Sequence, residues 1–298
     1  MKIAQYQHDH GLAIGMDLDG RWVDYTKAYA VYALLECGVA MLPRTTIDQL
    51  LLRGEFEEKQ FRAVAAFVRK KKMQRDLRLP SDVQLCAPLL RPGKIVALGL
   101  NYALHVKEGS FAVPKEPIVF MKAGSSVIGP GETVRIPRGL GRMDHEVELA
   151  VVIGKTATEV TKRSAWNVIA GYTICNDVTA RSLQTHDINN RHPWFRSKSF
   201  DTFSPVGPWI VTKDDIRPPV HLDIECRVNG RIRQKANTRA LLFDIPAMIE
   251  FITRYITLEP GDLISTGTPE GIGPIRHGDT MVCRIQNIGE LRNPVRYR

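Results

Sequence analysis

The chain has 298 residues, of which 44% are hydrophobic and 24% charged, and this composition is typical of a globular protein with an ordinary core. A chain of this length permits one large domain, or one large domain with a smaller one. The formal net charge is +9, but no nucleic-acid-binding motif accompanies the basic residues. We therefore expect an anionic small molecule as the partner and not a nucleic acid.

Cysteine usage and the lack of a targeting segment indicate a reducing compartment. The five cysteines are scattered and include no Cys-x-x-Cys pair, which argues against a disulfide framework and against a zinc site. The first residues do not resemble a signal peptide, and no apolar run approaches the length of a transmembrane helix. We expect a cytoplasmic protein that does not engage a membrane.

Residues 1–90 are expected to form a small α/β domain with no catalytic signal. Alternating residues over 2–25 predict a hairpin, with a second turn at Asp19-Gly20. Three helices are predicted to follow, one capped by Thr26 and ended by Gly38, one from Thr46 to near Gly54, and one from about Phe56 to Gln74. The apolar face of the third helix consists of Phe61, Val64, Ala65 and Val68. Its basic end at 69–72 is interpreted as a solvated helix end.

Residues 91–298 are predicted to form a β-rich domain. Short apolar strands alternate with turns rich in Gly and Pro, a pattern typical of a sandwich, barrel or roll. The predicted strands are 95–98, 118–121, 134–136, 146–153, 170–175, 207–211, 222–228, 263–265 and 280–285, and the predicted helices are 103–108 and 245–255. Neither a dinucleotide-binding glycine motif, a P-loop nor a serine-hydrolase elbow is present, so these chemistries lack support.

An acidic strand is the first candidate for chemistry. Segment 144–154 is predicted as a strand in which Asp144, Glu146 and Glu148 share one face. Carboxylates this close repel one another unless water solvates them or a cation lies between them, and Mg²⁺ and Mn²⁺ prefer such oxygen ligands. Asp177 closes a later predicted strand and can complete a three-carboxylate site. The alternatives are a solvated strand face and an ordinary turn residue.

Two further segments contain candidate catalytic groups, and a third can bind an anion. His105 and Glu108 lie three residues apart in the predicted helix and share its face. A carboxylate beside an imidazole makes a competent general base for water, although such pairs also occur as surface electrostatics. Lys198 lies in a predicted loop and can present an ammonium group to an anion. The Gly/Thr-rich turn at 266–273 either cradles a carboxylate with its N–H groups or is an ordinary tight turn.

Together, six segments between residues 94 and 294 resemble the fumarylacetoacetate hydrolase family, in its short-chain branch. They occur in the order that the family has and span about two-thirds of the chain. The segments are Gly99-Leu100-Asn101-Tyr102 with His105 and Glu108, Phe120-Met121-Lys122, Asp144-His145-Glu146-Val147-Glu148-Leu149, Gly171-Tyr172-Thr173-Ile174-Cys175-Asn176-Asp177-Val178-Thr179-Ala180-Arg181, Lys198-Ser199-Phe200-Asp201-Thr202-Phe203, and Thr266-Gly267-Thr268-Pro269-Glu270-Gly271-Ile272-Gly273.

The resemblance implies a fold, a metal and a set of site residues. The implied fold is an α+β, β-rich mixed β-sandwich roll, usually a homodimer, which the small N-terminal domain precedes here. The implied ligands of Mg²⁺ or Mn²⁺ are Glu146, Glu148 and Asp177. The implied catalytic residues are His105 and Glu108, on a lid helix over the substrate, and Lys198. The substrate-binding residues are expected to be Tyr102, Gln184 and Thr268.

The function that follows is hydrolysis of a C–C bond in a 2,4-dioxo acid of the acylpyruvate or fumarylpyruvate type. The cation is expected to stabilise the enolate left by the break, and the His105–Glu108 pair to deprotonate the attacking water. The alternatives left open are oxaloacetate decarboxylation, isomerisation of a 2-hydroxy-dienoate, lyase action on ureidoglycolate, and a non-catalytic scaffold that a metal stabilises.

Overall fold

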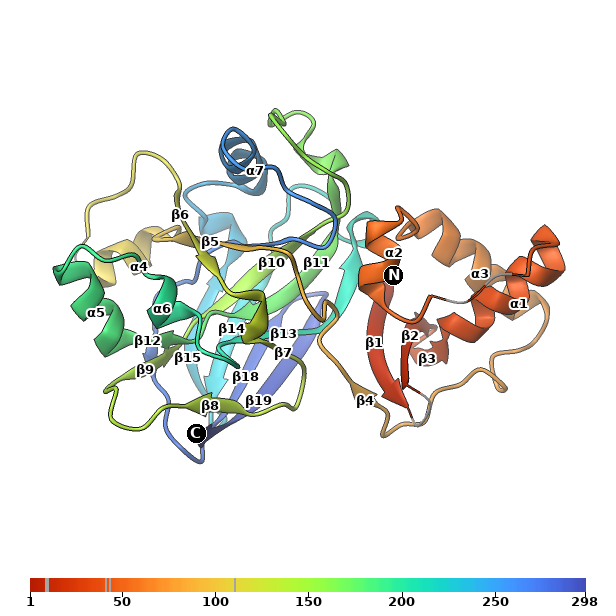
Figure 1. Cartoon of the computed structure of the whole chain (residues 1–298), viewed down its shortest axis with the longest axis horizontal. Helices are drawn as coiled ribbons and strands as arrows, with labels where there is room; N and C mark the ends of the chain where they lie inside the picture. Colours follow the sequence, from red (N-terminus) through yellow and green to blue (C-terminus); the bar gives the residue numbers. More distant parts are fainter. Residues whose placement is uncertain (9–10, 41, 43, 110) are drawn as a thin grey trace.

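The computed structural model describes residues 1–298 apart from 9–10, 41, 43 and 110, and within them a mixed sheet of 11 strands runs through the molecule (Figure 1). The strands of this main sheet are β1 (Lys2–His8), β2 (Gly11–Leu18), β3 (Arg21–Asp24), β4 (Gln84–Leu85), β5 (Ile95–Gly99), β6 (Ile118–Lys122), β7 (Val127–Ile128), β10 (Val147–Ile153), β11 (Ile169–Asn176), β13 (Ser204–Thr212) and β16 (Leu263–Ser265). Their order is β3-β2-β1-β13-β11-β10-β16-β5-β6, with β4 beside β1 and β7 beside β13.

Three helices, α1 (Tyr25–Cys37), α2 (Ile47–Leu52) and α3 (Glu58–Lys70), lie with β1–β4 at one end of the molecule (Figure 1). Helix α1 begins one residue before the predicted cap Thr26, because the Asp24 side chain accepts the Lys27 N–H at 2.9 Å and caps the helix instead. Gly38 ends α1 with φ of 67°, as predicted. Helix α3 is shorter than predicted at both ends, but its predicted apolar face is buried, which confirms the pattern.

The N-terminal strands are continuous with the rest of the main sheet. Strand β1 pairs antiparallel with β13, where Ile3 lies opposite Ile210. Both residues belong to one buried cluster that also contains Phe61 of α3 and Ala150 of β10. The N-terminal helices therefore pack on a core that the rest of the chain helps to build, and the domain boundary near residue 90 stays a prediction.

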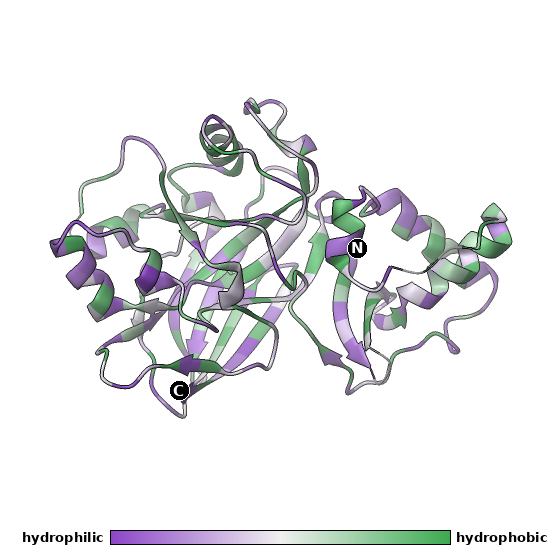
Figure 2. Cartoon of the chain, viewed as in Figure 1, coloured by the Kyte–Doolittle hydropathy of each residue, from purple (hydrophilic) through white to green (hydrophobic). Residues whose placement is uncertain are grey.

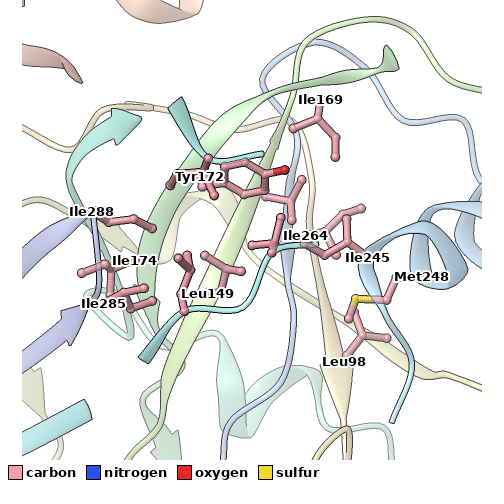
Figure 3. Close-up of a cluster of buried hydrophobic side chains, with 14 of the residues drawn as sticks. Leu98, Leu149, Ile169, Tyr172, Ile174, Ile245, Met248, Ile264, Ile285 and Ile288 are labelled. Atoms are coloured by element: carbon pink, nitrogen blue, oxygen red, sulfur yellow. The ribbon is translucent and has the colours of Figure 1, made fainter. Parts of the chain in front are cut away.

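A second sheet packs against the main sheet and makes the sandwich. In the described part of the chain its five strands have the order β15-β14-β18-β19-β8. They are β8 (Val134–Ile136), β14 (Asp223–Val228), β15 (Arg231–Asn237), β18 (Thr280–Ile285) and β19 (Gly289–Tyr297). Leu149 and Ile174 of the main sheet meet Ile285 between the layers, and Met248 of α7 (Ile245–Thr253) closes one side (Figure 3). This arrangement confirms the predicted β-rich, mixed sandwich.

The two layers differ in how they meet solvent. All residues of β10 and β11 are buried, since both faces of these central strands are covered. Strands β14 and β18 alternate buried and more exposed residues, as strands with one solvated face do. Figure 2 shows hydrophobic and hydrophilic residues alternating along the strands of this second sheet. Strands β15 and β19 are absent from the sequence-based prediction, because charged side chains interrupt their apolar pattern.

A small sheet and three short helices surround one end of the sandwich. Among the described residues, the sheet consists of β9 (Met143–His145), β12 (Thr179–Ala180) and β17 (Gly273–Pro274). The helices are α4 (Ala103–Glu108), α5 (Arg181–Asn189) and α6 (Phe195–Lys198), so Lys198 ends a single helical turn and not the predicted loop. Within the described residues, no helix has the length and apolarity needed to cross a membrane.

Candidate active site

Three carboxylates that are distant in sequence meet beside the main sheet. Glu148 lies on β10, Glu146 lies immediately before it, and Asp177 follows β11. The antiparallel pairing of β10 with β11 brings them together, and the Asp177 N–H donates to the Glu146 carbonyl at 2.8 Å. One oxygen of each carboxylate lies within 4.8 Å of the others, and all three side chains are buried. The structure thus assembles the three predicted ligands.

The prediction of one continuous strand through Glu146 is wrong, because the structure divides this segment into two strands. The backbone leaves the sheet at Glu146, whose N–H donates to the Asn176 side chain at 2.9 Å, while the Val147 N–H donates to Gln234 at 3.1 Å. Strand β9 before the break belongs to the small sheet and β10 after it to the main sheet. Asp144 therefore does not join the cluster: its oxygens pair with Arg142 at 2.6 Å and with Arg181 at 2.8 Å.

The cluster holds unequal charges. Burial, followed by repulsion from Asp177 and Glu146, raises the pKa of Glu148 to about 8, well above its ordinary range. Burial alone would also raise the pKa of Glu146, but the adjacent Lys198 and Arg181 outweigh it and hold that pKa far below its ordinary value. Glu148 thus resists ionisation, although the Ser265 hydroxyl and the Gly267 N–H donate to its Oε2 at 2.6 and 2.8 Å.

Two buried lysines reach the same carboxylates. Lys198 Nζ lies 2.7 Å from Glu146 Oε2 and 2.5 Å from Asp177 Oδ2, and Lys122 Nζ lies 2.6 Å from Asp177 Oδ1. Lys198 is a predicted catalytic residue, whereas the sequence alone indicates no role for Lys122. The signal for Lys122 is its place within the apolar strand β6, where a lysine is fully buried only if it is paired. It fixes Asp177 and donates to the Lys198 carbonyl.

The residues present fit a hard divalent cation. The donor set is three buried carboxylates without a sulfur or histidine ligand, which suits Mg²⁺ or Mn²⁺ better than Zn²⁺. A cation between them would relieve the repulsion that raises the pKa of Glu148. The buried Tyr102 hydroxyl, near enough to Glu148 to interact with it electrostatically, has no hydrogen-bond partner among the described residues.

A cavity of 470 Å³ connects this cluster with α4. His105 Nδ1 lies 3.1 Å from Glu108 Oε2, and both residues line the cavity together with Glu146 and Glu148. The remaining polar residues of the lining are Arg142, Arg181, Gln184, Thr185, Lys198 and Thr268. Its large apolar side chains are Leu98, Leu100, Phe111, Phe120, Ile188, Trp194 and Ile272. The predicted general base and two of the three predicted carboxylate ligands therefore face one space, whereas Asp177 lies outside the lining described for the cavity.

The predicted substrate-binding residues are placed differently from one another. Gln184 and Thr268 line the cavity. Gln184 accepts a hydrogen bond from Arg181, and the Thr268 hydroxyl donates to the Val147 carbonyl at 2.9 Å. Tyr102 is 1% exposed and lies outside the lining described for the cavity. All three assignments stay predictions.

The Gly/Thr-rich turn cradles carboxylates of the protein itself. The Gly267 N–H donates to Glu148, and the Gly271 N–H donates to Glu108 Oε1 at 3.1 Å. Gly267 has φ of +97°, and a Cβ there would lie 2.8 Å from the Asn101 Cβ, so a side chain does not fit. The predicted anion cradle is present, and it orients one metal-ligand candidate and one member of the His–Glu pair.

The chain is similar to one protein family, to several known proteins and to solved structures. The model of the fumarylacetoacetate (FAA) hydrolase C-terminal family matches residues 94–296. An uncharacterized protein of Pyrococcus horikoshii is 49% identical over 202 residues, 68% of this chain and 87% of that protein. A mitochondrial oxaloacetate tautomerase, Fahd2a of Rattus norvegicus, is 40% identical over 261 residues, 85% of this chain and 80% of that protein. The crystal structure of maleylpyruvate hydrolase from Sphingobium sp. SYK-6 with manganese(II) and pyruvate is similar over 100% of this chain and 99% of that chain, at a TM-score of 0.76 and 33% identity.

Proposed function

The chain belongs to the fumarylacetoacetate hydrolase family, and from that premise we propose that it is a divalent-metal-dependent hydrolase of a C–C bond in a 2,4-dioxo acid. One observation carries the proposal: the His105–Glu108 pair and the buried carboxylates Glu146 and Glu148 line the same cavity. A general base for water and oxygen ligands for Mg²⁺ or Mn²⁺ are both needed for this reaction. The alternative reactions, such as decarboxylation and isomerisation, need the metal ligands but no attacking water.

The His105–Glu108 pair is arranged to take a proton from water. With the Nδ1 proton donated to Glu108, the Nε2 atom of His105 is left as the base, and Gly271 holds the Glu108 carboxylate in place. The water oxygen forms a bond to C4 of the 2,4-dioxo acid and its proton passes to His105. The C3–C4 bond then breaks with its electron pair going to C3, and C3 takes up a proton. The products are a carboxylic acid and a shorter 2-oxo acid.

The charges around the carboxylates favour the enolate that this step leaves. A bound Mg²⁺ or Mn²⁺ would supply a Lewis acid for the substrate's 2-oxo and carboxylate oxygens. The Lys198 ammonium is buried beside Glu146 and Asp177, and their charges raise its pKa against the effect of burial. It therefore stays protonated and can neutralise an oxyanion in the cavity. Phe120 and Trp194 pack edge to face, with 5.4 Å between their ring centroids, and make this side of the cavity apolar.

A second candidate is tautomerisation of oxaloacetate. The rat relative that is 40% identical is named as an oxaloacetate tautomerase. In oxaloacetate C4 is a carboxylate and not a ketone, so no water attack is required. The His105–Glu108 pair would then move a proton between C3 and the 2-oxo oxygen, and the same cavity would hold the enol. Decarboxylation of oxaloacetate would use the same enolate.

The deciding experiment is an assay of EDTA-stripped protein reloaded with Mg²⁺ or Mn²⁺. Acylpyruvates, fumarylpyruvate and oxaloacetate are offered separately. Metal-dependent loss of the diketo-acid absorbance supports hydrolysis. Faster enol–keto equilibration of oxaloacetate without loss of carbon supports the tautomerase, and release of pyruvate from oxaloacetate supports the decarboxylase. Inactivity towards all of them would count against each of these assignments and favour an isomerase, a lyase or the scaffold.

Variants on α4 test the role of the His–Glu pair. We expect His105→Ala and Glu108→Ala to bind the metal normally and to lose hydrolysis by about 10²- to 10⁴-fold, the usual contribution of general acid–base catalysis. The matched control is Lys107→Ala, an exposed residue of the same helix outside the described cavity lining. Wild-type turnover by either pair variant would contradict the assignment.

The homodimer and the cytoplasmic location also stay proposals. Light scattering on the purified protein tests the homodimer.

A further inference from the structure

A second cluster of metal-ligating side chains lies at the C-terminal end of α5, apart from the carboxylates. It consists of His186, Asp187 and His192, and one ligand atom of each lies within 4.8 Å of the others. The Asp187 carboxylate is fully buried, while the two imidazoles are 60% and 53% exposed. The proposed reaction gives these residues no task. The donor set, two imidazole nitrogens and one carboxylate oxygen, differs in kind from the all-oxygen set of the candidate active site.

The distances within this cluster suit a tetrahedral ion. His186 Nδ1 lies 3.6 Å and His192 Nδ1 lies 3.8 Å from the same oxygen, Asp187 Oδ1. Around tetrahedral Zn²⁺, with bonds of about 2.0–2.1 Å, neighbouring ligand atoms are roughly 3.4 Å apart. Both nitrogen–oxygen distances therefore have to shorten by only a few tenths of an ångström. The two imidazole nitrogens lie within 4.8 Å of one another, and both side chains are exposed enough to adjust around an ion. We propose that His186, Asp187 and His192 form a binding site for a transition-metal ion of the Zn²⁺ class, with water at the fourth position.

The local backbone favours a cation and limits the freedom of the ligands. His186 and Asp187 lie in the last turn of α5, where the negative end of the helix dipole attracts positive charge. The His192 N–H donates to the Asp187 carbonyl at 2.8 Å, which folds the chain back after the helix and brings the second imidazole over the carboxylate. The site is thus held by hydrogen bonds that exist before an ion binds.

Arg196 competes with the ion for the carboxylate. Its Nη2 lies 2.5 Å from Asp187 Oδ1, and its Nε lies 3.0 and 3.2 Å from the two oxygens. The atom that both imidazoles approach is therefore also the atom that the guanidinium contacts most closely. Because the Arg196 side chain is 54% exposed, it can move into solvent when the ion binds. Removal of this arginine is expected to strengthen metal binding, which a merely structural histidine cluster does not predict.

The site lies behind one wall of the cavity. Gln184, Thr185 and Ile188 of α5 line the cavity, and the Asp187–Arg196 pair ties α5 to α6, which carries Lys198. An ion bound to residues 186–192 would replace this tie by a metal bridge within α5 and its following turn. The test of binding does not depend on turnover, so failure of the proposed reaction would leave it unaffected.

The test is a Zn²⁺ titration of the full chain against a chromophoric chelator. Millimolar Mg²⁺ is present throughout, because it occupies oxygen-rich sites and does not favour histidine ligands. We expect the wild type to bind one equivalent of Zn²⁺, and His186→Ala and His192→Ala each to lower the Zn²⁺ affinity by at least about 30-fold. Changes to residues that only support the ligands already cost about 10- to 100-fold in affinity, and each of these variants removes one of the three ligands itself. His221→Ala, an exposed histidine elsewhere, is the matched control and should bind as the wild type does.

The remaining outcomes are equally definite. Arg196→Gln should bind Zn²⁺ at least threefold more tightly than the wild type. Co²⁺ bound in place of Zn²⁺ should show the visible absorption of a tetrahedral site, and His192→Ala should lack it. Equal Zn²⁺ affinity of the wild type and both histidine variants would overturn the site, and unchanged affinity of Arg196→Gln would overturn the competition. Circular dichroism of each variant verifies that its fold is intact.

Discussion

Glu148→Gln should stabilise the metal-free protein while it abolishes tight metal binding. Glu148 lies within 4.8 Å of two other carboxylates, and burial and their repulsion raise its pKa to about 8 from an ordinary value of 4.5. Glutamine has nearly the same shape and keeps an oxygen that can accept from Ser265 and Gly267. It cannot ionise, so the repulsion disappears at every pH.

The magnitude follows from linkage between protonation and folding. Between pH of about 4.5 and 8 the unfolded wild type has ionised Glu148 while the folded protein still holds its proton. The folded state therefore binds more protons, and the free energy of unfolding falls as the pH rises through this window. At about 1.4 kcal/mol per pH unit, the loss at pH 7 is about 3 kcal/mol relative to pH below 4.5. Glu148→Gln should be spared that loss.

The assay is urea unfolding of EDTA-treated wild type and Glu148→Gln at pH 5, 6, 7 and 8, repeated with Mg²⁺. Without metal, the variant should be the more stable protein by an amount that grows with pH to about 3 kcal/mol at pH 7. With Mg²⁺ the wild type should gain stability and the variant should not, because the ion binds the folded wild type alone. A variant that is less stable than the wild type at pH 8 without metal, or a difference independent of pH, would refute the reasoning.

Three further predictions concern neighbouring residues. Lys122→Met removes one of the two buried lysines that contact Asp177, so we expect a loss of up to about 3–5 kcal/mol in urea unfolding; an unchanged midpoint would show that Lys198 alone balances Asp177. Arg142→Leu removes a half-exposed guanidinium from the cavity wall, and KM should rise about tenfold for substrates with a second carboxylate and little for those without one. Gly267→Ala places a Cβ against Asn101 at positive φ, and isothermal titration should show weaker Mg²⁺ binding, since the turn that holds Glu148 has to shift.

Several features of this protein were determined by local sequence. The apolar spacing on α3 and the glycine after α1 specify a helix face and a helix end, because both depend on residues within a few turns. The order of the six segments, from Gly99-Leu100-Asn101-Tyr102 to the Gly/Thr-rich turn, was enough to indicate the family, which the match over residues 94–296 confirms. The His105–Glu108 pair was also predictable, since residues three apart in a helix share a face.

What only the tertiary structure decided is which distant groups meet. The strand breaks at Glu146 because side chains of Asn176 and Gln234 take its backbone hydrogen bonds, and no local pattern encodes those partners. Lys122 reaches Asp177 across 55 positions. The N–H groups of the Gly/Thr-rich turn bind the protein's own Glu148 and Glu108, although the same turn by itself is equally suited to a ligand. Spacing in the chain fixes what lies on one face of an element, whereas contacts between elements depend on how the sheets pair and pack.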